Sequence, residues 1–403
     1  MANLLRKIIP PVFISWYHFV WAFLGALLYR FPSQKLIVIG VTGTNGKSTT
    51  VEMISRILEE AKYNIASSSS IRFQIGEKEW RNTFKMTMPG RFFIQRFLRQ
   101  ATNAGCTHAV IEVTSEGILQ HRHRFIRFHT AVFTNLSPEH IERHGSFEKY
   151  RAAKRELFKA AREVHVINGD DENAPYFLQF PAKKIILYSL SDAKDIRLNL
   201  QLLGEFNVSN ALAAISVAKG FGISLDVCKR ALENIKAVPG RMEVVMAEPF
   251  RVIVDYAFTP AALEKVYQTL KSKFQNPNSK LICVLGAAGG GRDRWKRPVL
   301  GRIAEQYCDS IIITNEDPYD EDPNQILSEI KSGILNSSPS GFYEILDRRE
   351  AIAKALSLAH QGDTVVITGK GSEDSIAIAG GKKIPWDDRD VVREEMDKIK
   401  EKW

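Results

Sequence analysis

The chain has 403 residues, of which 44% are hydrophobic and 25% charged, and its net charge is +9. This composition excludes long disordered stretches, and the length allows two or three domains. A positive charge of this size suits anionic small molecules, a membrane surface or nucleic acid. We expect no nucleic-acid partner, because no basic patch is interleaved with aromatic residues.

The first 34 residues form a segment of their own. Residues 8–29, IIPPVFISWYHFVWAFLGALLY, carry no charge, with Arg6 and Lys7 before them and Arg30 after them. As a helix the run would be about 33 Å long, close to a bilayer core, and its Trp and Tyr residues are typical of membrane interfaces. We expect an apolar helix that attaches the protein to the inner face of the cytoplasmic membrane. Packing on the next domain, or a dimer contact, is the alternative.

Beyond residue 35, short apolar runs alternate with helical patterns. Buried strands are predicted at residues 36–41, 108–113, 130–134, 163–168 and 184–188, and a helix at 48–61. The alternation restarts after Val238-Pro239-Gly240, with strands at 252–256, 281–285, 310–314 and 364–368. This order indicates an α/β fold with mostly parallel sheets. We expect domains over residues 35–238 and 239–403.

Four cysteines, Cys106, Cys228, Cys283 and Cys308, are far apart in the sequence and form no CxxC pair. This spacing argues against a zinc site or a disulfide framework. We therefore expect reduced thiols in a cytoplasmic protein.

A glycine-rich loop, GVTGTNGKSTT over residues 40–50, follows the first predicted strand and opens the first helix. Glycines let backbone N–H groups turn towards phosphate oxygens, and a helix N-terminus adds positive charge. Lys47 can reach the β- and γ-phosphates of ATP, and the Ser48 hydroxyl can hold Mg²⁺. A glycine-rich turn without function is the alternative. The predicted ATP-binding residues of the loop are Gly43, Thr44, Asn45, Gly46, Lys47, Ser48 and Thr49.

TGTNGKST resembles the phosphate loop of the Mur ligases, which folylpolyglutamate synthetases share. Glu112 ends a predicted strand, where α/β sheets place ligands, and can complete a Mg²⁺ shell with Ser48. The next run, TSEGILQHR over residues 114–122, resembles the EVSSHGLxQHR segment of UDP-N-acetylmuramoyl-tripeptide synthetases. This resemblance implies that Thr114, Gln120 and Arg122 contact the acceptor substrate.

Two further segments bear on a second metal ion. TNLSPEHIERHG, residues 134–145, is similar to the family's TNLSxDHLDxHG, which implies that His140 is a ligand of a second Mg²⁺. YRAAKRELF, residues 150–158, resembles YxxAKxxLF, in which the family's lysine is carbamylated by CO₂. Lys154 is therefore expected to bind that ion as a carbamate. Two cations suit an attack of a carboxylate on the ATP γ-phosphate, which gives an acyl phosphate that an amine then displaces.

Nucleotide contacts are implied by three more motifs. LGEFNVSNALAA, residues 203–214, resembles LxGxFNxxNxxAA and implies that Asn207 and Asn210 approach the adenine, although Asn207 can instead cap a helix. GRME, residues 240–243, implies that Arg241 reaches ATP. DYAFTP, residues 255–260, resembles DYAHTP and implies that Asp255 binds the ribose.

The incoming amino acid is expected at three loops. GGGRDRWKRP, residues 289–298, and GKGSED, residues 369–374, resemble GGDRDxxKRP and GKGHED, which implies that Arg292, Gly369 and Glu373 bind it. EDPY, residues 316–319, stands where enzymes for meso-diaminopimelate have DNPR. Asp317 stands at the second position of that motif and is a candidate substrate contact. Tyr319 cannot bind a distal carboxylate as arginine does. Asp320, Glu321 and Asp322 follow, and this acidic loop suits a cationic side chain such as that of lysine.

Several positions depart from the family. Glu116, Phe258 and Ser372 each replace a histidine, and only Thr87 and Pro89 match the NTTP substrate motif, which leaves Thr87 as the candidate contact. Only 39 residues precede Gly40, so we expect the family's uridine-binding domain to be absent. The acceptor is then a small molecule or a lipid-linked peptide.

The sequence is identified as a member of the Mur ligase family. The resemblance implies a P-loop ATPase domain, a smaller Rossmann-like ligase domain, ATP and two Mg²⁺ ions. The expected function is addition of an amino acid to a muramyl-peptide-like acceptor in peptidoglycan synthesis, in the cytoplasm. A ligase for a polyglutamate or cyanophycin-like peptide, and an inactive membrane-tethered nucleotide-binding scaffold, are the alternatives.

Overall fold

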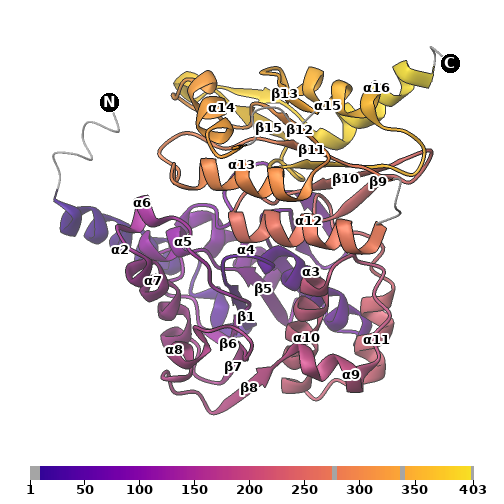
Figure 1. Ribbon diagram of the computed structural model, residues 1–403. Coiled ribbons are helices and arrows are strands. Elements are labelled where there is room, and N and C mark those ends of the chain that lie inside the picture. The colour runs from indigo at the N-terminus through magenta and orange to yellow at the C-terminus, as the bar shows by residue number, and fades with distance from the viewer. Residues whose placement is uncertain (1–9, 275–278, 336–340, 401–403) are drawn as a thin grey trace. The chain divides into compact units, whose positions relative to one another are not determined.

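The computed structural model describes residues 10–274, 279–335 and 341–400. The chain divides into two compact units (Figure 1). Unit 1 comprises Met1–Ser137, Ser146–Gln201 and Phe206–Ile235, and unit 2 comprises Pro138–Gly145, Leu202–Glu205 and Lys236–Trp403. Two short segments that precede residue 236 thus belong to unit 2, which the sequence did not predict.

Unit 1 is built on an eight-stranded sheet with the order β4-β3-β2-β5-β1-β6-β7-β8. The strands are β1 (Ile37–Thr42), β2 (Ile65–Ser68), β3 (Arg72–Ile75), β4 (Lys78–Arg81), β5 (His108–Glu112), β6 (Phe128–Phe133), β7 (Val164–Asn168) and β8 (Lys184–Tyr188). All neighbours are parallel except in the β2-β3-β4 meander. The five predicted strands are confirmed to within two residues at each end.

Helices flank this sheet. They are α3 (Lys47–Glu60), α4 (Arg91–Asn103), α5 (Ser115–Leu119), α7 (Phe147–Ala160), α8 (Ala174–Leu178), α9 (Ala193–Ile196), α10 (Glu205–Gly220) and α11 (Leu225–Glu233). Short 3-10 turns occur at Pro32–Lys35 and Leu190–Asp192. A buried cluster that includes Val38, Phe97, Phe133 and Leu157 joins α4 and α7 to the strands. Burial of these apolar side chains holds the two helices against the sheet.

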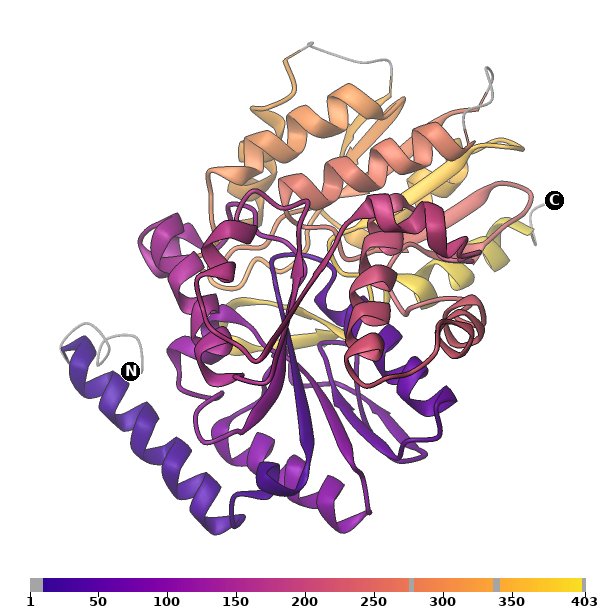
Figure 2. The same cartoon turned by 90° about the horizontal axis from the view of Figure 1, so that it is seen from below.

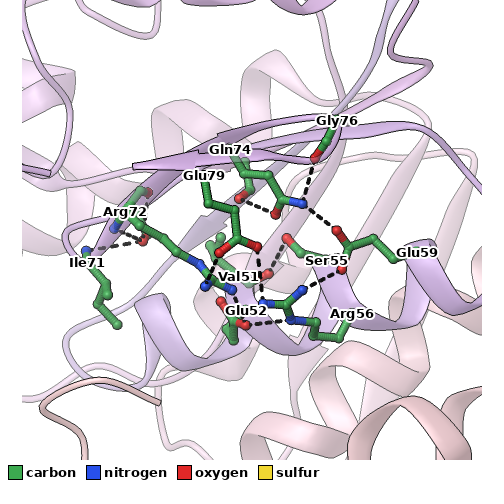
Figure 3. Close-up of polar contacts among 12 residues, drawn as sticks. Val51, Glu52, Ser55, Arg56, Glu59, Ile71, Arg72, Gln74, Gly76 and Glu79 are labelled. Carbon is green, nitrogen blue, oxygen red and sulfur yellow. Dashed lines mark hydrogen bonds and ion pairs between the residues drawn. The ribbon is translucent and has the colours of Figure 1, made fainter. Parts of the chain in front are cut away.

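A charged network ties α3 to the β3-β4 hairpin (Figure 3). Arg56 donates to Glu52 and Glu59 on its own helix, at 2.9 Å each, and to Glu79 of β4 at 3.2 Å. Arg72 of β3 also pairs with Glu52 and Glu79. The network therefore holds the hairpin against α3, the helix that follows the glycine-rich loop.

The apolar N-terminal run is helical over α2 (Pro11–Leu28), and it packs against α4. Figure 2 shows it as the indigo helix at the edge of the molecule. Ala22 and Ala26 are buried, and Gly25 lies against the backbone of Arg91 and Phe92. Over the described residues, none of the helices combines the length and hydropathy that crossing a bilayer requires. In the structure this helix packs on the domain that follows it, which was the alternative considered for the run. Residues 8 and 9 lie outside the described part.

Unit 2 contains a six-stranded sheet with the order β13-β12-β11-β14-β10-β9. The strands are β9 (Glu243–Met246), β10 (Arg251–Asp255), β11 (Leu281–Leu285), β12 (Ser310–Ile313), β13 (Phe342–Glu344) and β14 (Thr364–Thr368). Its helices are α6 (Ile141–His144), α12 (Pro260–Phe274), α13 (Lys296–Tyr307), α14 (Pro323–Lys331), α15 (Arg348–Leu358) and α16 (Asp388–Lys400). A two-stranded ribbon, β15 (Ser375–Ala377) and β16 (Lys383–Pro385), flanks a 3-10 turn at Ala379–Gly381. Only β9 is antiparallel in the large sheet, and the four predicted strands are confirmed to within one residue.

The expectation of reduced thiols was wrong for two cysteines. Cys283 of β11 and Cys308, which follows α13, form a disulfide with 6.0 Å between their Cα atoms. The crossover through α13 returns the chain beside β11, which places residues 25 apart within bonding distance. Cys106 and Cys228 are free and buried.

Candidate active site

The glycine-rich loop joins β1 to α3 in unit 1. Gly43 and Gly46 have φ angles of 154° and 80°. A Cβ at Gly43 would lie 1.9 Å from Thr134 Oγ1, and one at Gly46 would lie 2.3 Å from Asn210 Oδ1. Both positions therefore require glycine. The loop is a tight backbone cradle at a helix N-terminus, the arrangement that binds phosphate groups.

Lys47 begins α3 at the end of this loop. Its Nζ donates to the carbonyl of Thr44 over 2.8 Å and lies 4.0 Å from Glu112 Oε1. The amide of Asn45 donates to Asn135 Oδ1 at 2.9 Å. The predicted lysine is thus held over its own loop, in position to meet an anion there.

Glu112, at the end of β5, is buried and receives three hydrogen bonds on one oxygen. Ser48 Oγ, Ser70 Oγ and the Ser70 amide donate to Oε2, each at 2.9 Å. Hydroxyl and carboxylate oxygens are the ligands that Mg²⁺ prefers. No group of three or more His, Cys, Asp or Glu residues suited to a metal occurs in the described ranges. Magnesium at this point would therefore depend on Ser48, Glu112 and the phosphates of a nucleotide.

Ser70 was missed by the sequence analysis. It follows β2, a short strand of sequence IASS that the apolar pattern did not reveal. Only the pairing of β2 with β5 brings Ser70 to Glu112.

Lys154 of α7 also faces the phosphate loop. Its Nζ donates to the carbonyl of Gly43 at 2.7 Å and lies 4.6 Å from the centre of the Tyr150 ring. Lys154 is 2% exposed. Burial, reinforced by the charge of Lys47, lowers the pKa of this amine well below its usual value. A neutral amine is the form that reacts with CO₂, so the environment fits carbamylation.

The two asparagines of α10 lie beside the phosphate loop. Thr50 Oγ1 donates to Asn210 Oδ1 at 3.3 Å, and Asn210 Nδ2 donates to Asn207 Oδ1 at 3.1 Å. Both side chains are buried. Asn207 is the third residue of the helix, so it does not occupy the capping position before it. Whether either reaches an adenine stays a prediction.

The predicted acceptor contacts come together elsewhere in unit 1. Thr114 caps α5 by accepting a hydrogen bond from the Gly117 amide at 3.1 Å. Arg122 donates to Gln120 Oε1 at 2.7 Å and also to the carbonyl of Met88. Thr87, half-buried, precedes Met88. The structure therefore brings the Thr87 loop to Gln120 and Arg122, while Thr114 serves as a helix cap.

In unit 2 the segment Pro138–Gly145 is bound to the loop before α13. Glu139 and Lys296 form an ion pair of 2.8 Å in which each side chain is 2% exposed. The amides of Ile141 and Glu142 donate to Asp293. Burial raises the pKa of Glu139 despite its pairing with Lys296. His140 adopts a left-handed backbone with φ of 57° before α6, and its role as a metal ligand stays a prediction.

The predicted nucleotide contacts of unit 2 lie near β10. Both oxygens of Asp255 accept backbone hydrogen bonds, from Met242 at 2.7 Å and Ala257 at 2.6 Å. Burial raises the pKa of Asp255, and Arg241 opposes that shift. The Arg241 guanidinium lies 4.3 Å from the centre of the Tyr256 ring. Asp255 thus holds the turn after Gly240, and its contact with a ribose stays a prediction.

A buried acidic cluster with one lysine marks the predicted amino-acid site. Lys370 donates to Asp317 at 2.8 Å and also to Glu373, which accepts from the Tyr256 hydroxyl at 3.1 Å. Burial and the neighbouring Asp317 raise the pKa of Glu316, and its Oε2 has no hydrogen-bond partner among the described residues. Asp317 and Glu373 are predicted site residues, whereas Lys370 was missed, although it lies inside the GKGSED motif.

Close packing shapes this cluster. Gly369 has φ of 105°, and a Cβ there would lie 2.4 Å from Glu316 Oε2. Burial raises the pKa of Tyr319, and a hydrogen bond with Arg292 opposes the shift. The predicted carboxylate ligand Arg292 is thus in contact with the residue that replaces the arginine of DNPR.

A phosphate loop between a strand and a helix, in a chain that also contains a second α/β unit, is typical of nucleotide-binding enzymes. Family models match residues 41–218, as a Mur ligase middle domain, and residues 240–371, as a Mur ligase, glutamate ligase domain. The UDP-N-acetylmuramoyl-L-alanyl-D-glutamate–2,6-diaminopimelate ligase of Syntrophomonas wolfei is 37% identical, over 93% of this chain and 81% of its own. The UDP-N-acetylmuramyl-tripeptide synthetase of Roseiflexus sp. is 36% identical, over 92% and 80%.

A solved structure of a UDP-N-acetylmuramoyl-L-alanyl-D-glutamate–2,6-diaminopimelate ligase matches with a TM-score of 0.62 and 32% identity, covering 94% of this chain and 83% of that one. The chain therefore belongs to the Mur ligase family, whose members are amide ligases that use ATP and Mg²⁺.

Proposed function

We propose that this chain joins an amino acid to a muramyl-peptide acceptor, at the expense of ATP, in peptidoglycan synthesis. The observation that supports this most is the set of groups around the phosphate loop. Lys47, Ser48, Glu112 and the buried amine of Lys154 all lie at the loop or contact it. The similarity to tripeptide synthetases supplies the acceptor class.

In this proposal the loop amides and Lys47 bind and orient the ATP phosphates. Ser48 and Glu112 hold Mg²⁺, which when bound neutralises phosphate charge. His140 and a carbamate on Lys154 are the proposed ligands of a second Mg²⁺. The acceptor carboxylate attacks the γ-phosphorus, ADP leaves, and the amine of the incoming amino acid then displaces phosphate from the acyl phosphate.

We propose a cationic amino acid such as lysine as the second substrate. Glu316, Asp317 and Glu373 gather three carboxyl groups around one lysine, Lys370. Tyr319 has no charge to offer the distal carboxylate of meso-diaminopimelate. Arg292 is the proposed partner of the α-carboxylate, because guanidinium binds carboxylate in a bidentate manner.

We also propose contact with the inner face of the cytoplasmic membrane through residues 8–29, and an acceptor that is either soluble or lipid-linked. Supply of ATP places the reaction in the cytoplasm. The length and apolar character of the run support this contact.

A phosphate-release screen tests the proposal. Purified protein is given ATP, Mg²⁺, an acceptor and one amino acid at a time, and the products are identified by mass spectrometry. The acceptors are UDP-linked muramyl dipeptide, its lipid-linked form, a γ-glutamyl peptide and a cyanophycin-like peptide. We expect turnover only with a muramyl acceptor, and Lys47→Ala, which removes the phosphate contact without touching the core, should abolish it.

Turnover with the γ-glutamyl or cyanophycin-like peptide alone would instead assign a ligase for another polymer. ATP binding without turnover on any acceptor would favour the inactive scaffold.

A further inference from the structure

Helix α2 has two faces that differ in the size of their side chains. The inner face consists of small or polar side chains, His18, Ala22, Gly25 and Ala26, and packs on α4. The outer face consists of large side chains, namely Phe13, Trp16, Tyr17, Leu24, Leu27 and Leu28. Their exposed fractions are 67%, 69%, 57%, 39%, 52% and 63%. Their spacing of three, four, seven and eleven residues places them on one side of the helix.

Contacts on the inner side fix the orientation of α2 on unit 1. Arg99 Nε donates to the carbonyl of Tyr29 at 2.9 Å, and Ser15 Oγ lies 2.8 Å from His121 Nε2. The ring of Phe125 packs against Phe19 and Phe23, with centroids 5.2 Å and 5.4 Å apart. The helix is thus bound along its length, so the outer face is presented to its surroundings as a continuous surface.

A surface of this composition is unusual for a protein in water. Single exposed apolar residues are common, whereas a continuous patch of large ones marks a contact with a protein or a membrane. Two of the six side chains are Trp16 and Tyr17, the types that concentrate where lipid meets water.

Charge decides which contact the patch favours. Residues 11–36, 91–103 and 120–130 contain no aspartate or glutamate. They form α2, its C-terminal extension, α4 and the loop that carries His121 and Phe125. The cations of these segments are Arg30, Lys35, Arg91, Arg96, Arg99, Arg122, Arg124 and Arg127. Arg124 lies 3.8 Å from Glu156 of α7, and Arg127 has the carboxylate of Glu163 in its neighbourhood. The exposed cations include Arg30, Lys35, Arg96 and Arg127.

An apolar helix face beside cations that outnumber nearby carboxylates complements anionic headgroups above an acyl layer. A second copy of this chain would bring the same cations together, which disfavours that occupant.

We propose that the outer face of α2 docks on an anionic lipid surface, with the helix lying in the plane of the membrane. Phe13, Trp16 and Leu27 enter the boundary between headgroups and acyl chains. Arg30 and Arg127 bind headgroup phosphates. This inference specifies the membrane contact proposed above, and it does not depend on which amino acid or acceptor the enzyme uses.

Co-sedimentation with lipid vesicles tests the inference on the full-length chain. We expect binding to vesicles that contain phosphatidylglycerol, and much weaker binding to pure phosphatidylcholine. The variant Phe13→Ser/Trp16→Ser/Leu27→Ser should lose at least about tenfold in partition coefficient, because it removes three apolar side chains that enter the lipid. Arg30→Gln/Arg127→Gln should lose about fivefold for each charge, and only on anionic vesicles.

Leu335→Ser is the matched control, since Leu335 is 71% exposed in unit 2 and should leave vesicle binding unchanged. Circular dichroism checks that each variant is folded. Phosphate release in solution should be unchanged in the triple variant, so failure of the lipid contact and failure of the ligase proposal are separable.

Equal vesicle binding by the wild type and the triple variant would overturn the assignment of this face. No vesicle binding by the wild type, together with a dimer in sedimentation velocity that the triple variant abolishes, would replace lipid by a second copy of the chain. Binding to both vesicle types with equal strength would remove the role of Arg30 and Arg127.

Discussion

Replacing Arg348 by methionine should destabilise unit 2 far more than replacing its neighbour Arg349. Arg348 begins α15 and is 1% exposed. Its Nε and one terminal nitrogen donate to the two oxygens of Asp388, at 2.8 Å and 2.7 Å. The same guanidinium donates to the carbonyls of Thr368 at 2.9 Å and Asn315 at 3.2 Å. One side chain thus joins the ends of β14 and β12 to the start of α16.

The magnitude follows from what remains after the change. Removing one partner of a buried ion pair typically costs about 3–5 kcal/mol, because the other charge is left buried without a counter-charge. Asp388 would keep one donor, Trp386 Nε1 at 2.7 Å, but the buried carbonyl of Thr368 and the partly buried carbonyl of Asn315 would lose the guanidinium. We expect a loss of about 4 kcal/mol in the free energy of unfolding, roughly a thousandfold in the folded-to-unfolded ratio.

Arg349 is the matched control. It lies next to Arg348, but its side chain is 39% exposed and pairs with the exposed Glu394 as well as with Glu395, which is mostly buried. Exposed pairs of this kind contribute about 1 kcal/mol or less. Urea unfolding compares the two variants, since urea is uncharged and does not screen the ion pairs. The double change Arg348→Met/Asp388→Leu should recover most of the lost stability, because no charge then stays buried. A midpoint for Arg348→Met no lower than for Arg349→Met would refute the reasoning.

Three further predictions concern single residues or one substrate. Lys154→Ala should lose phosphate release, and short carboxylates such as acetate should restore part of it by replacing the carbamate; full activity without acetate would contradict the modification. Burial, with a smaller effect of Arg124, lowers the pKa of His123 to about 3. The neutral imidazole therefore costs the folded state nothing above the usual pKa of 6.5. As pH falls from 6.5 towards 3, the unfolded chain binds a proton that the folded chain does not, and the free energy of unfolding falls by up to about 1.4 kcal/mol per pH unit. His123→Leu should therefore narrow the difference between urea midpoints measured near pH 7.5 and near pH 5, and an unchanged difference would remove His123 as its cause. In competition, lysine should be incorporated in preference to meso-diaminopimelate, and selective use of meso-diaminopimelate would show that Tyr319 does not exclude it.

The central strands of both sheets could be predicted because the local sequence shows their burial as a run of apolar residues. β5 and β11 are fully buried, and a strand buried on both faces is a continuous apolar run. β2 and β4, with sequences IASS and KEWR, carry no such run, and β4 lies at the edge of its sheet. These strands depend on pairing with neighbours, which the local pattern does not contain.

The candidate site divides in the same way. Lys47, Ser48 and Glu112 stand at fixed points of a strand–loop–helix pattern, so their positions could be predicted. Ser70 reaches Glu112 only through the pairing of β2 with β5. For α2, hydropathy could not distinguish the packed face from the exposed one, because alanines and large apolar residues both count as apolar. Side-chain size, which decides how closely α4 can approach, carries that information.

Two buried lysines illustrate why burial alone does not assign a chemical role. Lys154 and Lys370 are both almost fully buried, and burial favours the neutral form of each. For Lys154 the strongest neighbouring charge is Lys47, which lowers the pKa further. For Lys370, Glu373 and Asp317 outweigh burial and raise the pKa. Lys154 is therefore suited to react as a neutral amine, and Lys370 to remain a cation that holds two carboxylates in place. The nearest charge, rather than the depth of burial, decides which lysine can be modified and which one organises its site.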